Sequence, residues 1–215
     1  MYRFGLSILS DYNMFWQPVE YHYNESHRHY HNWDHIEEMI GFIHECRHQV
    51  SINPALAETF SEFTSLGLDH ELAILFHDAV YIPGSKLNED ASMDLMRSYL
   101  VKYPQEFPVE RIERIAYYIQ TTRSHISNNI DAQAVIDLDL MRLAAPFEQF
   151  LVNAELIRKE YAGASEEEFT KGRIAFMENM LSRENIFYTK YGREHWQPNA
   201  IRNLELSLKS LKGEK

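Results

Sequence analysis

Residues 73–81 of the chain read Ala73-Ile74-Leu75-Phe76-His77-Asp78-Ala79-Val80-Tyr81, an apolar run with a histidine and an aspartate side by side in its middle. Burying an imidazole and a carboxylate in such a run is costly unless a hydrogen-bond partner or a metal ion compensates them. Adjacent helical residues project about 100° apart, so both side chains reach one ion only from the edge of a buried face. The run predicts a central helix whose polar pair has either hydrogen-bond partners or a metal ion.

Composition limits the classes of protein that the chain can belong to. Its 215 residues suit one domain with a substantial core, and 45% hydrophobic and 25% charged residues are typical of globular proteins. The net charge of −11 argues against a nucleic-acid polymer or an anionic membrane as the main partner. A small phosphorylated substrate stays compatible, because a metal ion and a few local cations can overcome the mean field.

The expected compartment is the cytoplasm. The single cysteine, Cys46, excludes an intrachain disulfide framework and lies in a helical pattern that predicts a buried, inert thiol. The first residues contain no sustained apolar core of a signal peptide, and no run approaches the roughly 18 apolar residues of a membrane span.

Almost every segment has the periodicity of a helix, and no segment has a convincing strand alternation. The expected helices cover about 6–15, the stripe Ile36 to Ile43, a start at Asn53-Pro54, 68–79, 88–103, 108–119, 131–143, 147–161, 165–180 and 198–211. Pro83-Gly84 should break the central helix, and residues 121–129 should form a loop or a fraying end. The fold class is therefore all-α, in roughly eight to ten helices.

Three places put metal-ligand residue types on apolar helices: His31 with His35, His77 with Asp78, and Asp137 with Asp139. Taken singly, each has an ordinary explanation. Two histidines four residues apart are commonly a surface pair, and one aspartate is commonly a cap or an ion-pair partner. An ordered series of such residues on successive apolar helices is much harder to explain without a metal.

The series resembles the HD-domain metal-dependent phosphohydrolases, and within them the bacterial predicted HD-superfamily hydrolases. The resemblance spans about 28–183 and includes the following stretches: Arg28 to His35, His77-Asp78-Ala79-Val80-Tyr81, Asn88-Glu89, Thr121 to His125, Asp137-Leu138-Asp139-Leu140 and Ile157 to Tyr161. One departure is Leu143-Ala144, where that family often has Leu-Gly. The resemblance implies a single HD-type helical domain over 1–215, with a metal-binding core at about 28–162 and C-terminal helices 163–212 packed on it.

The resemblance further implies that His35, His77, Asp78 and Asp139 bind the metal, with His125 as an extra ligand if a second ion binds. His35 is preferred to His31 because it directly precedes the apolar stripe, and Asp139 to Asp137 because the residue after it leads back into the core. Two imidazoles and two carboxylates suit an octahedral divalent ion (Mn, Fe, Co, Ni or Mg, with Zn as a further candidate) and leave positions open for water and a phosphoryl oxygen.

Five other residues are candidates for work on a substrate. Glu89 and Asp90 follow the loop after His77-Asp78 and are either acid–base groups or simply acids that favour a helix start. Arg28 and Arg123 are candidate phosphate clamps, and either could equally pair with a surface acid. His31 is a candidate substrate ligand. In contrast, Arg158, Glu160 and Tyr161 look like an architectural network.

The leading functional hypothesis is hydrolysis of a phosphoester or phosphoanhydride of a small, nucleotide-like substrate by a metal-activated water. The alternatives are a di-iron oxygenase on the same scaffold, for which His31 and His125 supply further ligands, and a non-catalytic helical binding module that a metal braces.

Overall fold

The computed structural model describes residues 19–213, and every regular element within this range is helical. The all-α prediction is therefore confirmed. The α-helices are α2 (Trp33–Ile52), α3 (Ser61–Thr64), α4 (Leu68–Phe76), α5 (Asn88–Leu100), α6 (Val109–Thr122), α7 (Ile130–Leu140), α8 (Phe147–Glu160), α9 (Glu166–Leu181) and α10 (Gln197–Lys212). Two 3₁₀ turns, η2 (Pro54–Leu56) and η3 (Met141–Ala144), and a π-helical turn, η4 (Gly192–Trp196), join them. The expected opening helix over 6–15 lies outside the described residues.

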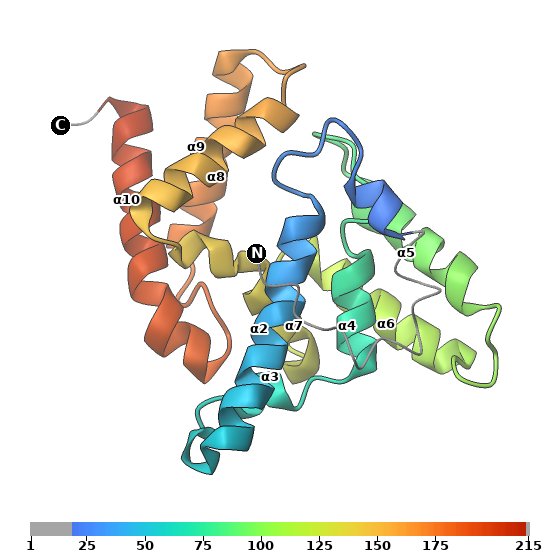
Figure 1. Cartoon of the computed structure of the whole chain (residues 1–215). Helices are drawn as coiled ribbons and strands as arrows, with labels where there is room; N and C mark the ends of the chain where they lie inside the picture. The colour runs from blue at the N-terminus through green and yellow to red at the C-terminus, as the bar shows by residue number, and fades with distance from the viewer. Residues whose placement is uncertain (1–18, 214–215) are drawn as a thin grey trace.

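Helix α4 lies at the centre of the main hydrophobic core, which also takes in buried residues of α2, α5, α6 and α7 (Figure 1). The run from Leu72 to Phe76 is buried on all sides. A helix that is apolar all round can be stable only when neighbours surround it. α2, α6 and α7 all contact α4, and the expected stripe of α2, Ile36, Met39, Ile40 and Ile43, faces this core.

A second hydrophobic cluster joins the last helices to α7. It contains Ile136 and Leu140 of α7, Phe150 of α8, Met177 and Met180 of α9, and Ala200 and Leu204 of α10. In Figure 1, α8, α9 and α10 form one group on the left, and α4, α5 and α6 lie on the right, with α2 and α7 between them. α7 is therefore the element that both halves of the core share.

Several helix ends confirm the sequence prediction. Pro108 and Pro146 directly precede α6 and α8, and a capping box of Ser165 and Glu168 starts α9 where a helix is expected from 165. The break at Pro83-Gly84 is present, and Gly84 has a φ of +79°, which only glycine adopts without strain. Cys46 is buried as predicted, and burial raises the pKa of its thiol to about 12.

Other helix ends were predicted wrongly. α4 ends at Phe76, so His77 and Asp78 lie in the turn after the helix rather than within it. The helix expected over 131–143 is α7, which ends at Leu140, and its cap is Asn129, whose side chain accepts hydrogen bonds from the amides of Asp131 and Ala132. Asn53-Pro54 starts only a 3₁₀ turn, and Thr121 and Thr122 belong to α6 rather than to the loop.

Side chains take up the carbonyl groups at the end of α4, which a helix leaves without partners, and in the turn that follows it. The carbonyls of the following residues accept from these groups: Ile74 from Nδ1 of His77, Leu75 from the hydroxyl of Tyr23, and Asp78 and Ala79 from the guanidinium of Arg28. The turn that carries His77 and Asp78 is therefore held from outside the helix.

A search of the described residues finds no helix long and apolar enough to cross a membrane.

Candidate metal centre

The structure brings together the four residues that the resemblance implies as metal ligands. His35 comes from the first turn of α2, His77 and Asp78 from the turn after α4, and Asp139 from the last turn of α7. One ligand atom each from His35, His77 and Asp139 lies within 4.8 Å of the other two. Asp78 adjoins this cluster, because its Oδ2 lies 3.2 Å from Nε2 of His77.

The carboxylate of Asp139 links the histidines. Its Oδ1 lies 3.2 Å from Nε2 of His35 and 3.5 Å from Nε2 of His77, and its Oδ2 lies 3.0 Å from Nε2 of His125. Three imidazoles and two carboxylates therefore converge in one place. The histidine–carboxylate set is the donor type that suits first-row divalent ions.

Nε2 of His77 gives the clearest sign that a cation belongs at this centre. Nδ1 of His77 lies 2.8 Å from the carbonyl oxygen of Ile74, which can only accept, so Nδ1 carries a proton. In the neutral ring Nε2 is then a lone pair, and it is buried without a hydrogen-bond partner although two carboxylate oxygens lie 3.2 and 3.5 Å away. Metal-ligating histidines commonly donate their other N–H to a backbone carbonyl in this way.

The electrostatics of the cluster favour positive charge at this place, and without an ion that charge is a proton on His77. Burial disfavours the charged imidazolium, yet the charges of Asp78 and Asp139 hold the pKa of His77 well above its ordinary value. Burial likewise disfavours both carboxylates, yet His77 and the neighbouring hydrogen bonds keep the pKa values of Asp78 and Asp139 below the ordinary range. With neutral histidines the two carboxylates leave a charge of −2, which a divalent ion would balance.

His125 reaches the centre from a strained backbone position. Its φ is +52°, a left-handed conformation that is uncommon outside glycine. The carbonyl of His125 accepts hydrogen bonds from the guanidinium of Arg183 and from the hydroxyl of Tyr188. Such strain persists where surrounding contacts impose it, and it concentrates at functional sites. The contacts of Arg183 and Tyr188 therefore fix the direction of the His125 ring.

The cluster opens onto a cavity of about 880 Å³ between α7, α8 and α9. His31, His125 and Asp139 line the cavity on the side of the cluster. The side chains of His35 and His77 are only 1% and 2% exposed, whereas those of Asp78, Asp139 and His125 are 15%, 14% and 19% exposed. The centre is thus closed on its histidine side and open towards the cavity.

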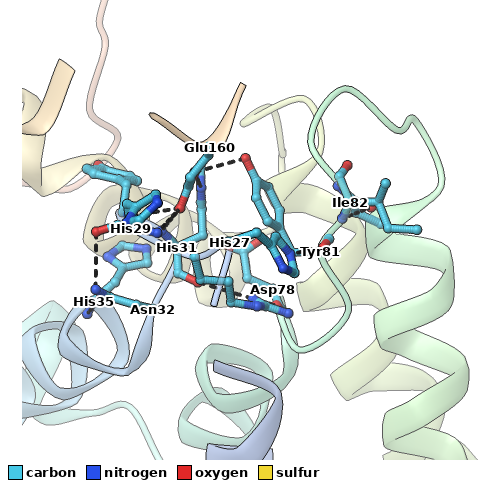
Figure 2. Close-up of polar contacts among 12 residues, drawn as sticks. His27, His29, His31, Asn32, His35, Asp78, Tyr81, Ile82 and Glu160 are labelled. Atoms are coloured by element: carbon cyan, nitrogen blue, oxygen red, sulfur yellow. Dashed lines mark hydrogen bonds and ion pairs between the residues drawn. The ribbon is translucent and has the colours of Figure 1, made fainter. Parts of the chain in front are cut away.

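Glu160 organises the other side of the site, as Figure 2 shows. Its Oε1 accepts from the backbone amides of His29, Tyr30 and His31, and its Oε2 bonds Nδ1 of His31 and the hydroxyl of Tyr81. Burial would raise the pKa of this carboxyl, but the hydrogen bonds and charge of His31 and the backbone amides lower it to about 2. This architectural role agrees with the sequence interpretation of Glu160.

His31 lies beside the metal cluster and outside it. Its ring packs 4.3 Å from the ring of Tyr81, between centroids, and lines the cavity. Burial lowers the pKa of His31, but the bond to Glu160 outweighs burial and the pKa is raised. Of the two candidate histidines, His35 is the one at the cluster, and His31 is placed where a substrate could contact it.

Arg28 does not act as a phosphate clamp in this structure. Its side chain is fully buried, and its guanidinium donates to the carboxylate of Glu25 and to the carbonyls of His31, Asp78 and Ala79. These bonds leave the guanidinium facing protein rather than the cavity. Arg28 is instead a positioning residue, because it holds the two backbone carbonyls that directly follow the Asp78 side chain.

The remaining candidates form a separate surface cluster. Arg123 at the end of α6 pairs with Glu89 and Asp90 in the first turn of α5, with nitrogen–oxygen distances of 3.1 and 2.7 Å. None of the three lines the cavity. The structure therefore brings these residues together as an ion-pair cluster and provides no contact between them and the metal centre.

Asp137 points away from the centre. Its buried carboxylate accepts from the amides of Tyr188 and Thr189 and from the hydroxyl of Thr189. Burial raises the pKa of Asp137 to about 7, although these three donors lower it. Gly192 is needed beside it, because a Cβ there would lie 2.8 Å from Oδ2 of Asp137. Asp137 thus anchors the segment before η4, and Asp139 faces the metal centre.

Sequence reasoning missed three residues of the cavity wall: Tyr30, Arg142 and Arg173. The ring of Tyr30 stacks on that of His35 at a centroid distance of 5.8 Å, and the guanidinium of Arg142 lies 5.0 Å from the same tyrosine ring. Arg142 follows the aspartate motif closely enough to have been suspected. Arg173 is one of two cations on α9, beside Lys171, and nothing in the sequence distinguishes it from a surface residue.

Comparison with known proteins gives no further guide: no protein-family model matches the chain, and neither a curated protein nor a solved structure matches it.

Proposed function

We propose that the chain is a metal-dependent phosphohydrolase of the HD type, acting on a phosphoester or phosphoanhydride of a small organic substrate. The observation that carries the proposal is the buried Nε2 atom of His77, which lies close to two carboxylate oxygens without a hydrogen bond. His35, His77, Asp78 and Asp139 would hold the ion, with His125 beside Asp139 as the further ligand of a second one.

The donor set fits such an ion. A divalent cation at this site would supply Lewis acidity, lowering the pKa of a water molecule and neutralising charge on a phosphoryl oxygen. The protein's own part is to hold the donors rigidly. Arg28 fixes the turn of Asp78, the carbonyl of Ile74 orients the ring of His77, and Arg183 fixes His125. Such supporting contacts usually change metal affinity or activity about 10- to 100-fold when removed.

The cavity supports a substrate larger than inorganic phosphate. Its volume of about 880 Å³ is in the range of sites for drug-sized organic molecules. His31 and His125 line it next to Asp139, so a phosphoryl group at the centre would lie against these two rings. We also propose a cytoplasmic location, on the basis of the single buried thiol of Cys46.

The test is phosphate and pyrophosphate release by purified protein loaded with Mn²⁺, Fe²⁺, Co²⁺, Ni²⁺, Mg²⁺ or Zn²⁺, over a panel of nucleotides and aryl phosphates. We expect turnover that requires a metal and falls at least about 100-fold in His77→Gln and Asp139→Asn. Asp94→Asn on the exposed face of α5 is the matched control and should keep full activity. Turnover that persists in both centre variants, or an inert metal-loaded protein, would refute the proposal.

His125 favours one alternative, a di-iron oxygenase, because it adds a third histidine next to Asp139. That function predicts two bound irons per chain and consumption of O₂ without phosphate release. A metal that only braces the fold predicts a lower melting temperature after chelation and no turnover of either kind. The panel therefore needs an oxygen electrode and a thermal melt beside the phosphate assay.

A further inference from the structure

The cavity next to the metal centre has an apolar, largely aromatic wall on the side of α8 and α9. Phe150, Ile157, Phe169 and Phe176 line it, together with Leu140 and Leu143 from the end of α7 and from η3. A phosphate group by itself makes no favourable contact with such an apolar wall. The wall indicates that the substrate presents an apolar body to α8 and α9.

Two arginines line this cavity, and they differ in their partners. Arg142 donates to the carboxylate of Glu38 at 2.5 Å and to the carbonyl of Tyr30. Arg173 has no ion pair or hydrogen bond with any of the residues that the structure describes, and its guanidinium lies 5.5 Å from the ring of Phe176. Arg173 is half-buried, and burial lowers the pKa of its guanidinium.

A partly desolvated guanidinium without an acceptor is costly, because the N–H donors on its buried side lose water without gaining a hydrogen bond. A bound anion would remove this cost. Arg173 also lies near Tyr30, whose phenol is influenced by the charges of both Asp139 and Arg173. Tyr30, Asp139 of the metal centre and Arg173 all line this one cavity.

We infer that Arg173 binds an anionic group of the substrate while the aromatic wall of α8 and α9 contacts its apolar body. The substrate class is then an organic phosphate with an apolar body and a second anionic group for Arg173, rather than a strongly hydrophilic phosphate. This inference rests on the proposed function for the chemistry at the metal centre, but the binding itself needs no metal.

Gly172 keeps part of the cavity free. It lines the cavity from α9, and a Cβ built on it meets no other atom within 4 Å. The Cβ of a leucine there would therefore meet open space, and the rest of the side chain would take up part of the cavity. Leucine would also favour the helix, because glycine costs about 1 kcal/mol relative to good helix formers. Gly172→Leu should thus fold at least as well as the natural chain and bind less.

The experiment measures binding of naphthalene-1-sulfonate and of neutral 1-naphthol to the metal-free full chain by calorimetry. Arg173→Met and Arg173→Gln should bind the sulfonate about tenfold more weakly or worse, and 1-naphthol as the natural chain does. Arg173→Lys should restore part of the loss. Gly172→Leu should weaken both probes, and Arg202→Met, an exposed arginine of α10, should change neither.

Equal sulfonate binding by Arg173→Met and the natural chain would overturn the inference, as would an absence of sulfonate binding by the natural chain. Because neither probe can be hydrolysed and no metal is added, these results are independent of phosphate release. If the metal-loaded natural chain shows no turnover but its sulfonate binding depends on Arg173, the proposed function alone is overturned. If the natural chain shows turnover but its sulfonate binding does not depend on Arg173, this inference alone is overturned.

Discussion

Replacing Glu160 with glutamine should destabilise the protein by about 3 kcal/mol near pH 6. The carboxylate accepts from three backbone amides, from the ring of His31 and from the hydroxyl of Tyr81, and its pKa falls from 4.5 to about 2. The free-energy equivalent of that difference is about 3 kcal/mol. Glutamine has the same shape and cannot carry the charge, so it removes this contribution with little change of volume.

The pH dependence has a definite sign. The pKa of Glu160 is lower in the folded state than in the unfolded chain, so its contribution is complete above pH 4.5 and disappears as the pH falls through about 2. The pKa of His31 is raised by the same contact, so the stability that the positive charge of His31 contributes is lost as the pH rises through that raised pKa. The stability difference between the natural chain and Glu160→Gln should fall by more than half by about pH 3.

The assay is urea unfolding followed by circular dichroism at pH 6, 4 and 3. Glu155→Gln, an exposed glutamate on the same helix, is the matched control and should stay within about 0.5 kcal/mol of the natural chain. A loss in Glu160→Gln no larger than that of the control would refute the reasoning. A loss of 3 kcal/mol that did not shrink towards pH 3 would show that charge on Glu160 is not its source.

Three further replacements separate the supporting contacts from the metal ligands. Arg28→Met leaves the buried carbonyl of Asp78 without its donor, so calorimetry should show at least about tenfold weaker Mn²⁺ binding than in the natural chain. An unchanged Mn²⁺ affinity would contradict the positioning role of Arg28. Asp137→Ala removes the acceptor of two backbone amides, so urea unfolding should show a loss of about 3 kcal/mol in stability, while the affinity for Mn²⁺ stays within about twofold of the natural chain. A large loss of Mn²⁺ affinity would instead indicate that Asp137 is a metal ligand. Arg183→Met removes a hydrogen-bond donor from the carbonyl of His125, whose backbone is strained, so NMR should show the His125 ring signals broadened or shifted while those of His35 stay in place. Unchanged His125 signals would show that Arg183 does not restrain this ring.

The sequence predicted the helical class because apolar periodicity is a local property of each segment. It predicted His35, His77, Asp78 and Asp139 as one group only through the order of motifs along the chain, since their side chains meet from three separate elements. Glu160 was correctly interpreted as architectural, although none of its partners could be named. Those partners lie about 80 to 130 positions earlier in the chain.

The prediction failed where a side chain depends on a distant backbone. Arg28 looks like a phosphate clamp locally, but its carbonyl partners at Asp78 and Ala79 come from a turn 50 residues later. The left-handed backbone of His125 is equally invisible, because no glycine or asparagine marks it. Helix ends were misplaced by one to three residues because hydrogen-bond partners of the terminal backbone groups come from other elements. The hydroxyl of Tyr23, for example, donates to the carbonyl of Leu75 near the end of α4.

The central claim is that His35, His77, Asp78 and Asp139 bind a divalent ion together, and calorimetric titration of the metal-free chain with Mn²⁺ tests it most directly. The account predicts one or two ions per chain, and at least about 100-fold weaker binding in Asp139→Asn with an unchanged helical circular dichroism spectrum. The natural chain failing to bind Mn²⁺ and the other divalent ions, or Asp139→Asn binding them as tightly as the natural chain, would contradict it.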